Sequence, residues 1–175
     1  MKGISDLRFF IEEEISKKRA VILAQNTTEP EALAAALWEF ILLNEEPISW
    51  RATWFMEHLG AENKEFVRPY LNAIVEAFPN FKYDGQRRSS LKILLMFPIT
   101  DFDYAKMLNY CFDLVLSNEA PVAVRMFSMA MLLEIVKLEP ELKGELKESL
   151  EFIIPHAQKG LLSAAWKTLR ALEKI

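Results

Sequence analysis

The residues of this 175-residue chain whose types could carry out catalysis are not grouped in a catalytic pattern. The two histidines, His58 and His156, stand far apart, and the single cysteine, Cys111, lies between two aromatic residues at an apolar position. No His, Cys and carboxylate set has the spacing of a metal site. The stretch Gly85-Gln86-Arg87-Arg88 lacks the glycine spacing of a phosphate-binding loop. We therefore expect no catalytic residue, no bound metal and no cofactor.

An arginine recurs at a regular interval and is the most suggestive chemical feature. One interpretation is a structural ladder, in which each guanidinium binds a turn carboxylate or backbone carbonyls through its planar fork of N–H donors. The other is a row of cations that binds an acidic partner or a phosphate backbone. The series consists of Arg51, Arg87 or Arg88, and Arg125, and the obvious carboxylate partners are Glu45 and Glu119.

Trp50 and Trp54 are four residues apart, off the apolar stripe formed by Ile48, Ala52 and Phe55. They would share a second face of one helix. That face is either an exposed aromatic surface or a contact with the next repeat, and we leave both open. Together with nearby polar and cationic positions it forms the candidate partner-binding face, which consists of Trp50, Trp54, His58, Arg87, Arg88, Lys167 and Arg170.

These residues must be positioned by helices, because the apolar residues follow a helical period and no strand alternation is present. A first helix is expected over about 5–25, with a possible break. Another helix, the fourth along the chain, is expected to begin after its cap Asn63 and to stop before Pro79. The other helices are expected at about 28–43, 47–59, 84–96, 100–116, 121–138, 141–158 and 161–174, and the helices near 28 and 100 are expected to open with the capping boxes 28–31 and 100–103. The short connections predict antiparallel neighbours.

The chain contains an internal repeat. The segment 44–51, Asn-Glu-Glu-Pro-Ile-Ser-Trp-Arg, matches 118–125, Asn-Glu-Ala-Pro-Val-Ala-Val-Arg, at four positions. The apolar stripes of the flanking helices match at the same offset of 74 residues. A middle copy lies about halfway, with Arg87 or Arg88 in the arginine position, and the last pair is more polar, as a capping repeat should be.

With an acidic residue, a proline and an arginine opening the second helix of a pair, the chain resembles the HEAT/armadillo-like α-helical repeat superfamily. These residues are Glu45, Pro47 and Arg51 in one copy and Glu119, Pro121 and Arg125 in another, whereas the middle copy has Asp84 in place of proline. The resemblance covers roughly residues 28–174. It implies an all-α fold, a right-handed α-α superhelix of about four antiparallel helix pairs plus an N-terminal helix. We expect a single domain over 1–175.

Charge and composition further reduce the classes of partner and location that the sequence allows. The net charge is −4 and the pI about 5.4, so no global positive field attracts nucleic acid. The N-terminus has no apolar stretch typical of a signal peptide, and the most apolar segment, 120–136, carries Arg125 and Glu134. We expect a cytoplasmic protein with no membrane partner.

Three classes of function were compared. The first is a non-enzymatic scaffold that holds a protein or peptide, acidic or aromatic-rich, on a curved helical face. The second is a DNA-binding or DNA alkylation-repair glycosylase-like HEAT-repeat module, in which Trp50, Trp54 and an acid such as Glu57 would act. The third is a helical enzyme like those of the fumarase/aspartase superfamily, whose Met-Pro-Lys signature loop is absent here. Of these classes we expect the scaffold, and we favour an enzyme less.

Overall fold

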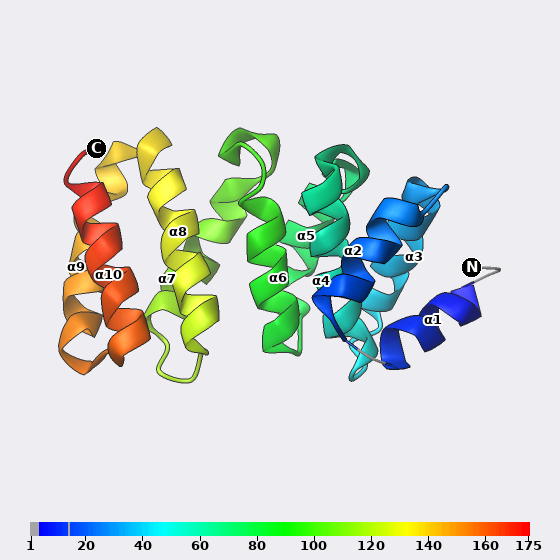
Figure 1. The fold of residues 1–175 in the computed structure, drawn as a ribbon. Coiled ribbons are helices and arrows are strands. Elements are labelled where there is room, and N and C mark those ends of the chain that lie inside the picture. The colour runs from blue at the N-terminus through cyan, green and yellow to red at the C-terminus, as the bar shows by residue number, and fades with distance from the viewer. Residues whose placement is uncertain (1–3, 14) are drawn as a thin grey trace. The chain divides into compact units, whose positions relative to one another are not determined.

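The computed structural model describes residues 4–13 and 15–175, and all regular elements in these ranges are helices (Figure 1). The chain divides into two compact units, residues 1–97 and 98–175. The expectation of an all-α fold is thereby confirmed, while the handedness of a superhelix remains a prediction.

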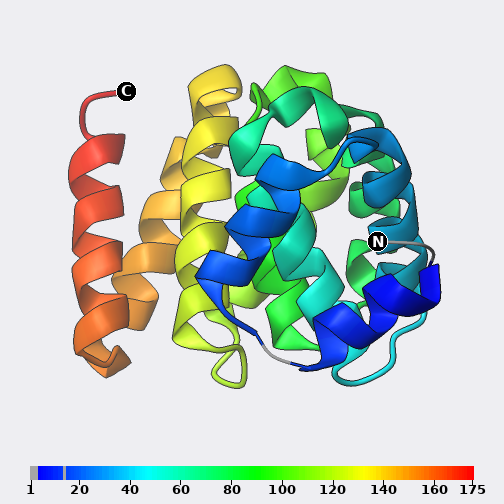
Figure 2. The same cartoon turned by 45° about the vertical axis from the view of Figure 1, so that its right-hand side comes forward.

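The described residues of the first unit, 4–13 and 15–97, form six α-helices. They are α1 (Ile4–Glu13), α2 (Lys17–Asn26), α3 (Pro30–Leu42), α4 (Ile48–Glu62), α5 (Leu71–Ala77) and α6 (Asp84–Leu94). Helix α4 is at the centre, because it contacts α1, α2, α3 and α6. In Figure 2 the blue helices α1 and α2 lie in front of the cyan α4. The core therefore gathers around α4, where Ile48, Ala52, Phe55, Met56 and Leu59 are buried.

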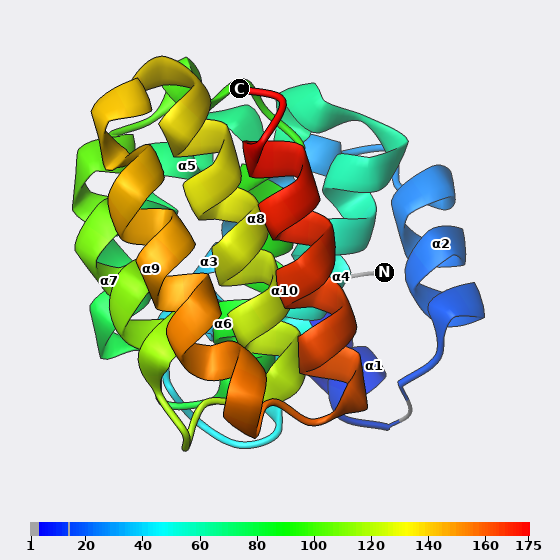
Figure 3. The ribbon, with the colours of Figure 1, turned by 90° about the vertical axis from the view of Figure 1, so that its left-hand side faces the viewer.

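The second unit contains α7 (Tyr104–Leu116), α8 (Val122–Leu138), α9 (Lys143–Ile153) and α10 (Lys159–Leu172). Figure 3 shows two layers, with α7 beside α9 and α8 beside α10, in agreement with the helix contacts. Consecutive helices pair as the short connections predict. The unit is thus two stacked helix pairs that share one apolar core.

The N-terminal segment has the break that the sequence allows, and the segment after Asn63 differs from the sequence expectation. The N-terminal helix is divided into α1 and α2, and Ser16 begins the second by accepting a hydrogen bond from the Arg19 amide at 3.3 Å. The long helix expected after Asn63 is only α5, preceded by two 3₁₀ turns at Lys64–Phe66 and Arg68–Tyr70. Pro69 explains this difference, since proline has no N–H to continue a helix across that position.

Asn44 joins the turn between α3 and α4 to the turn before α6. Its φ of 52° is in the left-handed region, which asparagine tolerates better than most residues. Its side-chain amide donates to the Asn80 carbonyl at 3.3 Å and its carbonyl oxygen accepts from the Lys82 amide at 3.3 Å. Successive turns are therefore fixed to one another by a single side chain.

Candidate functional site

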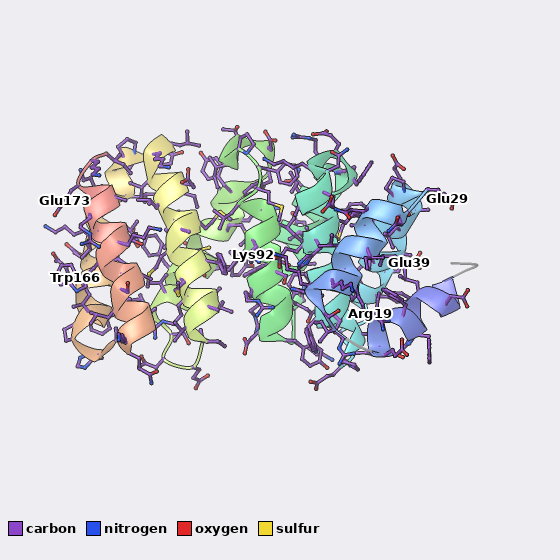
Figure 4. The ribbon with its side chains drawn as sticks, viewed as in Figure 1. Arg19, Glu29, Glu39, Lys92, Trp166 and Glu173 are labelled. Atoms are coloured by element: carbon purple, nitrogen blue, oxygen red, sulfur yellow. The ribbon has the colours of Figure 1, made fainter. Side chains whose placement is uncertain are left out.

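A hollow of about 510 Å³ is present in the first unit, on the side formed by α2, α4 and α6. Helix α4 provides its floor, and α2 and α6 flank it. Figure 4 labels a residue on each flanking helix, Arg19 on α2 and Lys92 on α6. The lining residues are Lys17, Val21, Trp54, Glu57, His58, Ala61, Glu62 and Lys92. We call this site the α2–α4–α6 hollow.

Two of the residues expected on the partner-binding face, Trp54 and His58, lie together in this hollow. Their rings are 4.3 Å apart between centroids and tilted by 57°. The His58 Nδ1 lies 2.9 Å from the Trp54 carbonyl oxygen, so that nitrogen carries the proton that it donates. In the neutral ring Nε2 is then left as a hydrogen-bond acceptor. The pair thus offers two neighbouring aromatic rings and a hydrogen-bond acceptor.

Glu57 and Lys92, which both line this hollow, form an ion pair. Glu57 is 5% exposed, and its Oε1 accepts a hydrogen bond from the Lys92 ammonium. The second oxygen, Oε2, is shielded from solvent and has no hydrogen-bond partner. A buried acceptor without a partner costs free energy, and such atoms need a structural or functional explanation. A carboxylate with one oxygen available for a donor therefore lies beside Trp54.

Sequence reasoning found only part of this hollow. Trp54, Glu57, His58 and Ala61 have the i, i+3, i+4, i+7 spacing of one helix face, and this signal could have grouped them. Lys17 and Val21 were missed because nothing in the sequence places α2 beside α4. Lys92 lies 35 residues after Glu57, about one repeat later, which is the only sequence signal for that ion pair.

Trp50 lies apart from the hollow and packs between repeats. A Cβ atom added to Gly85 of α6 would lie 3.0 Å from the Trp50 Cβ and 3.4 Å from ring carbon Cε3. The α4 and α6 backbones therefore approach closely at this point, and the Trp50 side chain occupies the space that a larger residue at 85 would need. Of the two alternatives for the tryptophan pair, packing applies to Trp50, and the hollow contains Trp54.

Gly85→Ala is expected to lower the free energy of unfolding by about 1–3 kcal/mol, because the added methyl group meets Trp50 and forces the helices apart. Gly144→Ala on α9 is the matched control, since nothing lies within 4 Å of a Cβ there. It is expected to change stability by less than about 1 kcal/mol, and in the stabilising direction. Urea unfolding followed by circular dichroism measures both, and equal effects would contradict the close approach at Gly85.

The recurring arginines bind the carbonyl groups at helix ends. Arg51 Nη1 donates to the carbonyls of Ile11 at 3.1 Å and of Glu12, in the last turn of α1. Arg125 donates to the Val115 carbonyl from Nε at 3.0 Å and from Nη2 at 2.8 Å, near the end of α7. The last carbonyls of a helix have no partner within it, so these contacts satisfy groups that would otherwise stay unpaired.

The carboxylates expected as partners are placed elsewhere. Glu45 pairs with Arg8 at 3.0 Å rather than with Arg51, and Glu119 is exposed. In the middle copy the equivalent contact is made by Gln86, whose side-chain N–H donates to the Ile41 carbonyl at 3.0 Å. We call these three contacts, made by Arg51, Gln86 and Arg125, the carbonyl rungs.

The remaining candidate cations are distributed over both units. Arg87 pairs with Asp84 at 3.1 Å and also donates to the Phe81 carbonyl, so it is committed to its own turn. Arg88 is half-buried on the same helix. Lys167 and Arg170 are exposed on α10, in the second unit. Within the first unit the structure thus brings Trp54 and His58 together, while Arg87 and Arg88 are not among the residues that line the hollow.

Cys111 is placed for packing. It is fully buried, and burial raises the pKa of its thiol to about 12, so a reactive thiolate is scarce at neutral pH. In the described parts of the chain, no group of three or more His, Cys, Asp or Glu residues is arranged as metal ligands would be. Nor is any helix among the described residues long and apolar enough to cross a membrane.

Comparison with known families gives one match. A model described as a HEAT repeat domain matches residues 8–172, which is nearly the whole chain. Neither the curated proteins nor the solved structures give a match. The match agrees with the helix pairs, the repeated turns and the carbonyl rungs described above. On this basis the chain belongs to the HEAT repeat domain family.

Proposed function

We propose that this protein is a non-enzymatic scaffold of the cytoplasm that holds a peptide segment of a partner protein in the α2–α4–α6 hollow. Helical-repeat proteins bind partners on extended faces formed by successive helices. The observation that carries the proposal is the hollow itself, in which an aromatic wall and a buried carboxylate lie between three neighbouring helices. The single cysteine is free, as is usual for proteins of a reducing compartment.

The DNA-repair alternative receives no comparable support. Arg87 is committed to Asp84 and a backbone carbonyl, and the ammonium of Lys92 is bonded to Glu57. Phosphate contacts need cations that are available to a backbone, and they supply most of the affinity for nucleic acid. We therefore propose a protein partner.

Selection of a phage-displayed library of random 12-residue peptides on the purified protein tests the proposal. Enriched peptides are expected to bind with micromolar Kd in calorimetry. Ala61→Arg, which fills the hollow from α4, is expected to weaken them by about tenfold or more, since a bulky charged group in a contact pocket removes both space and complementarity.

Ala35→Arg is the matched control, because Ala35 is exposed on α3 and does not line the hollow. This variant is expected to bind the peptides unchanged. If no peptide is enriched, or if both variants bind equally well, the proposed function is refuted.

A further inference from the structure

The α2–α4–α6 hollow presents hydrogen-bond acceptors to a ligand. Glu57 Oε2 has no partner, His58 Nε2 is an acceptor in the neutral ring, and the exposed Glu62 lies among the lining residues. Two lysines, Lys17 and Lys92, line the hollow as well, and the Lys92 ammonium is bonded to the other oxygen of Glu57. A carboxylate accepts several hydrogen bonds, so Glu57 has the capacity for a further donor at Oε2.

The wall of the hollow is a flat aromatic surface. The Trp54 and Phe55 rings meet edge to face, with centroids 5.5 Å apart and an interplanar angle of 83°, and Trp54 lines the hollow. An indole face attracts cations, and the planar guanidinium of arginine also stacks on it. A donor-rich, flat and positively charged group therefore meets both features at once.

Resting on the proposed function, we propose that the α2–α4–α6 hollow binds an arginine side chain of the partner segment. The guanidinium stacks on Trp54 and donates to Glu57 Oε2. Because Oε2 is shielded from solvent, a ligand reaches it when a lining side chain shifts. Lys92 is the lining group bonded to this carboxylate, and 35% of its side chain is exposed. Lys92 and the arginine then compete for one carboxylate.

The test uses N-acetyl-argininamide as the probe, compared with N-acetyl-lysinamide and with the neutral isostere N-acetyl-citrullinamide. Binding is followed by the indole N–H signal of Trp54 in nuclear magnetic resonance titrations, assigned with Trp54→Phe. The arginine compound is expected to bind with millimolar Kd, at least about fivefold tighter than the other two, because only it combines charge with a planar donor fork. Equal binding of lysinamide or citrullinamide would refute the site.

Two variants are expected to act in opposite directions. Glu57→Gln removes the charge while keeping the shape and is expected to weaken argininamide by about tenfold or more, whereas Glu39→Gln, on the exposed side of α3 and outside the hollow, changes affinity less than about twofold. Lys92→Met removes the competing cation and is expected to tighten binding at least about threefold. A purely structural ion pair would not produce this opposite response.

Circular dichroism checks that the variants keep their helical content. If Glu57→Gln does not fold, Lys92→Met decides, and unchanged or weaker binding by it contradicts the proposal. Selected peptides that are sensitive to Ala61→Arg but lack arginine would refute the arginine site and leave the proposed function standing. Binding of argininamide without any selected peptide would refute the proposed function and leave the arginine site standing.

Discussion

Replacement of Phe55 by alanine is expected to lower the free energy of unfolding by about 3–5 kcal/mol, the usual cost of truncating a large aromatic side chain in a core. Phe55 is 2% exposed on α4, the helix that contacts four others in the first unit. Its ring lies 5.9 Å from that of Phe10 and 5.5 Å from that of Trp54, both in edge-to-face geometry. The cavity left behind would therefore affect α1 and the base of the hollow as well as α4.

Urea unfolding followed by tryptophan fluorescence measures this effect. Phe9→Ala is the matched control, because Phe9 belongs to α1 but is 68% exposed. Its removal is expected to change stability by less than about 0.5 kcal/mol. A loss below about 1.5 kcal/mol for Phe55→Ala would show that the surrounding helices collapse into the space or that α4 is not central.

Arg125→Ala is expected to destabilise the protein by about 2–4 kcal/mol, mainly because the Val115 carbonyl loses both of its side-chain donors. Arg125 is 8% exposed, and desolvation lowers the pKa of its guanidinium. The residue stays charged at neutral pH because arginine starts from a very high pKa. The desolvation cost of burying the guanidinium is thus offset by its two hydrogen bonds to the Val115 carbonyl at the end of α7.

Two comparisons identify the cause. Arg170→Ala on the exposed surface of α10 is expected to change stability by less than about 0.5 kcal/mol. Arg125→Lys keeps the charge but supplies no planar fork, so it is expected to lose about half of what alanine loses. If lysine restored full stability, charge rather than the two hydrogen bonds to Val115 would hold the helix end.

Much of the architecture can be read from the sequence because apolar periodicity and proline positions are local signals. The matching turns at Asn44 and Asn118 predict two helix pairs correctly, and the family match supports the repeat. The segment after Asn63 is different, since its apolar spacing is helical but Pro69 leaves only α5 as α-helix. The division between α1 and α2 falls at Ser16, a local capping signal, and both helices contact α4.

The candidate site was less predictable, for a physical reason. Helical spacing places Trp50 and Trp54 on one face, but what covers that face depends on the neighbouring helices. A glycine at position 85 lets α6 come close to Trp50, whereas Trp54, one turn later, lies at the hollow. Likewise, the arginine repeat predicts a ladder, but its acceptors depend on where the helices end. Arg51 and Arg125 donate to carbonyls at the ends of α1 and α7 rather than to Glu45 and Glu119.

The carbonyl rungs have a consequence for how such a chain can grow by gene duplication. The rung of Arg125 closes within one helix pair, since donor and acceptor lie on α8 and α7. A copy of that pair brings its own rung with it. The rungs of Arg51 and Gln86 reach back to α1 and α3 of the preceding pair. A duplicated copy of one of those pairs keeps its rung only when the preceding pair, which carries the carbonyl acceptor, is duplicated with it. The position of the acceptor therefore sets the smallest segment that can be duplicated with its rung intact.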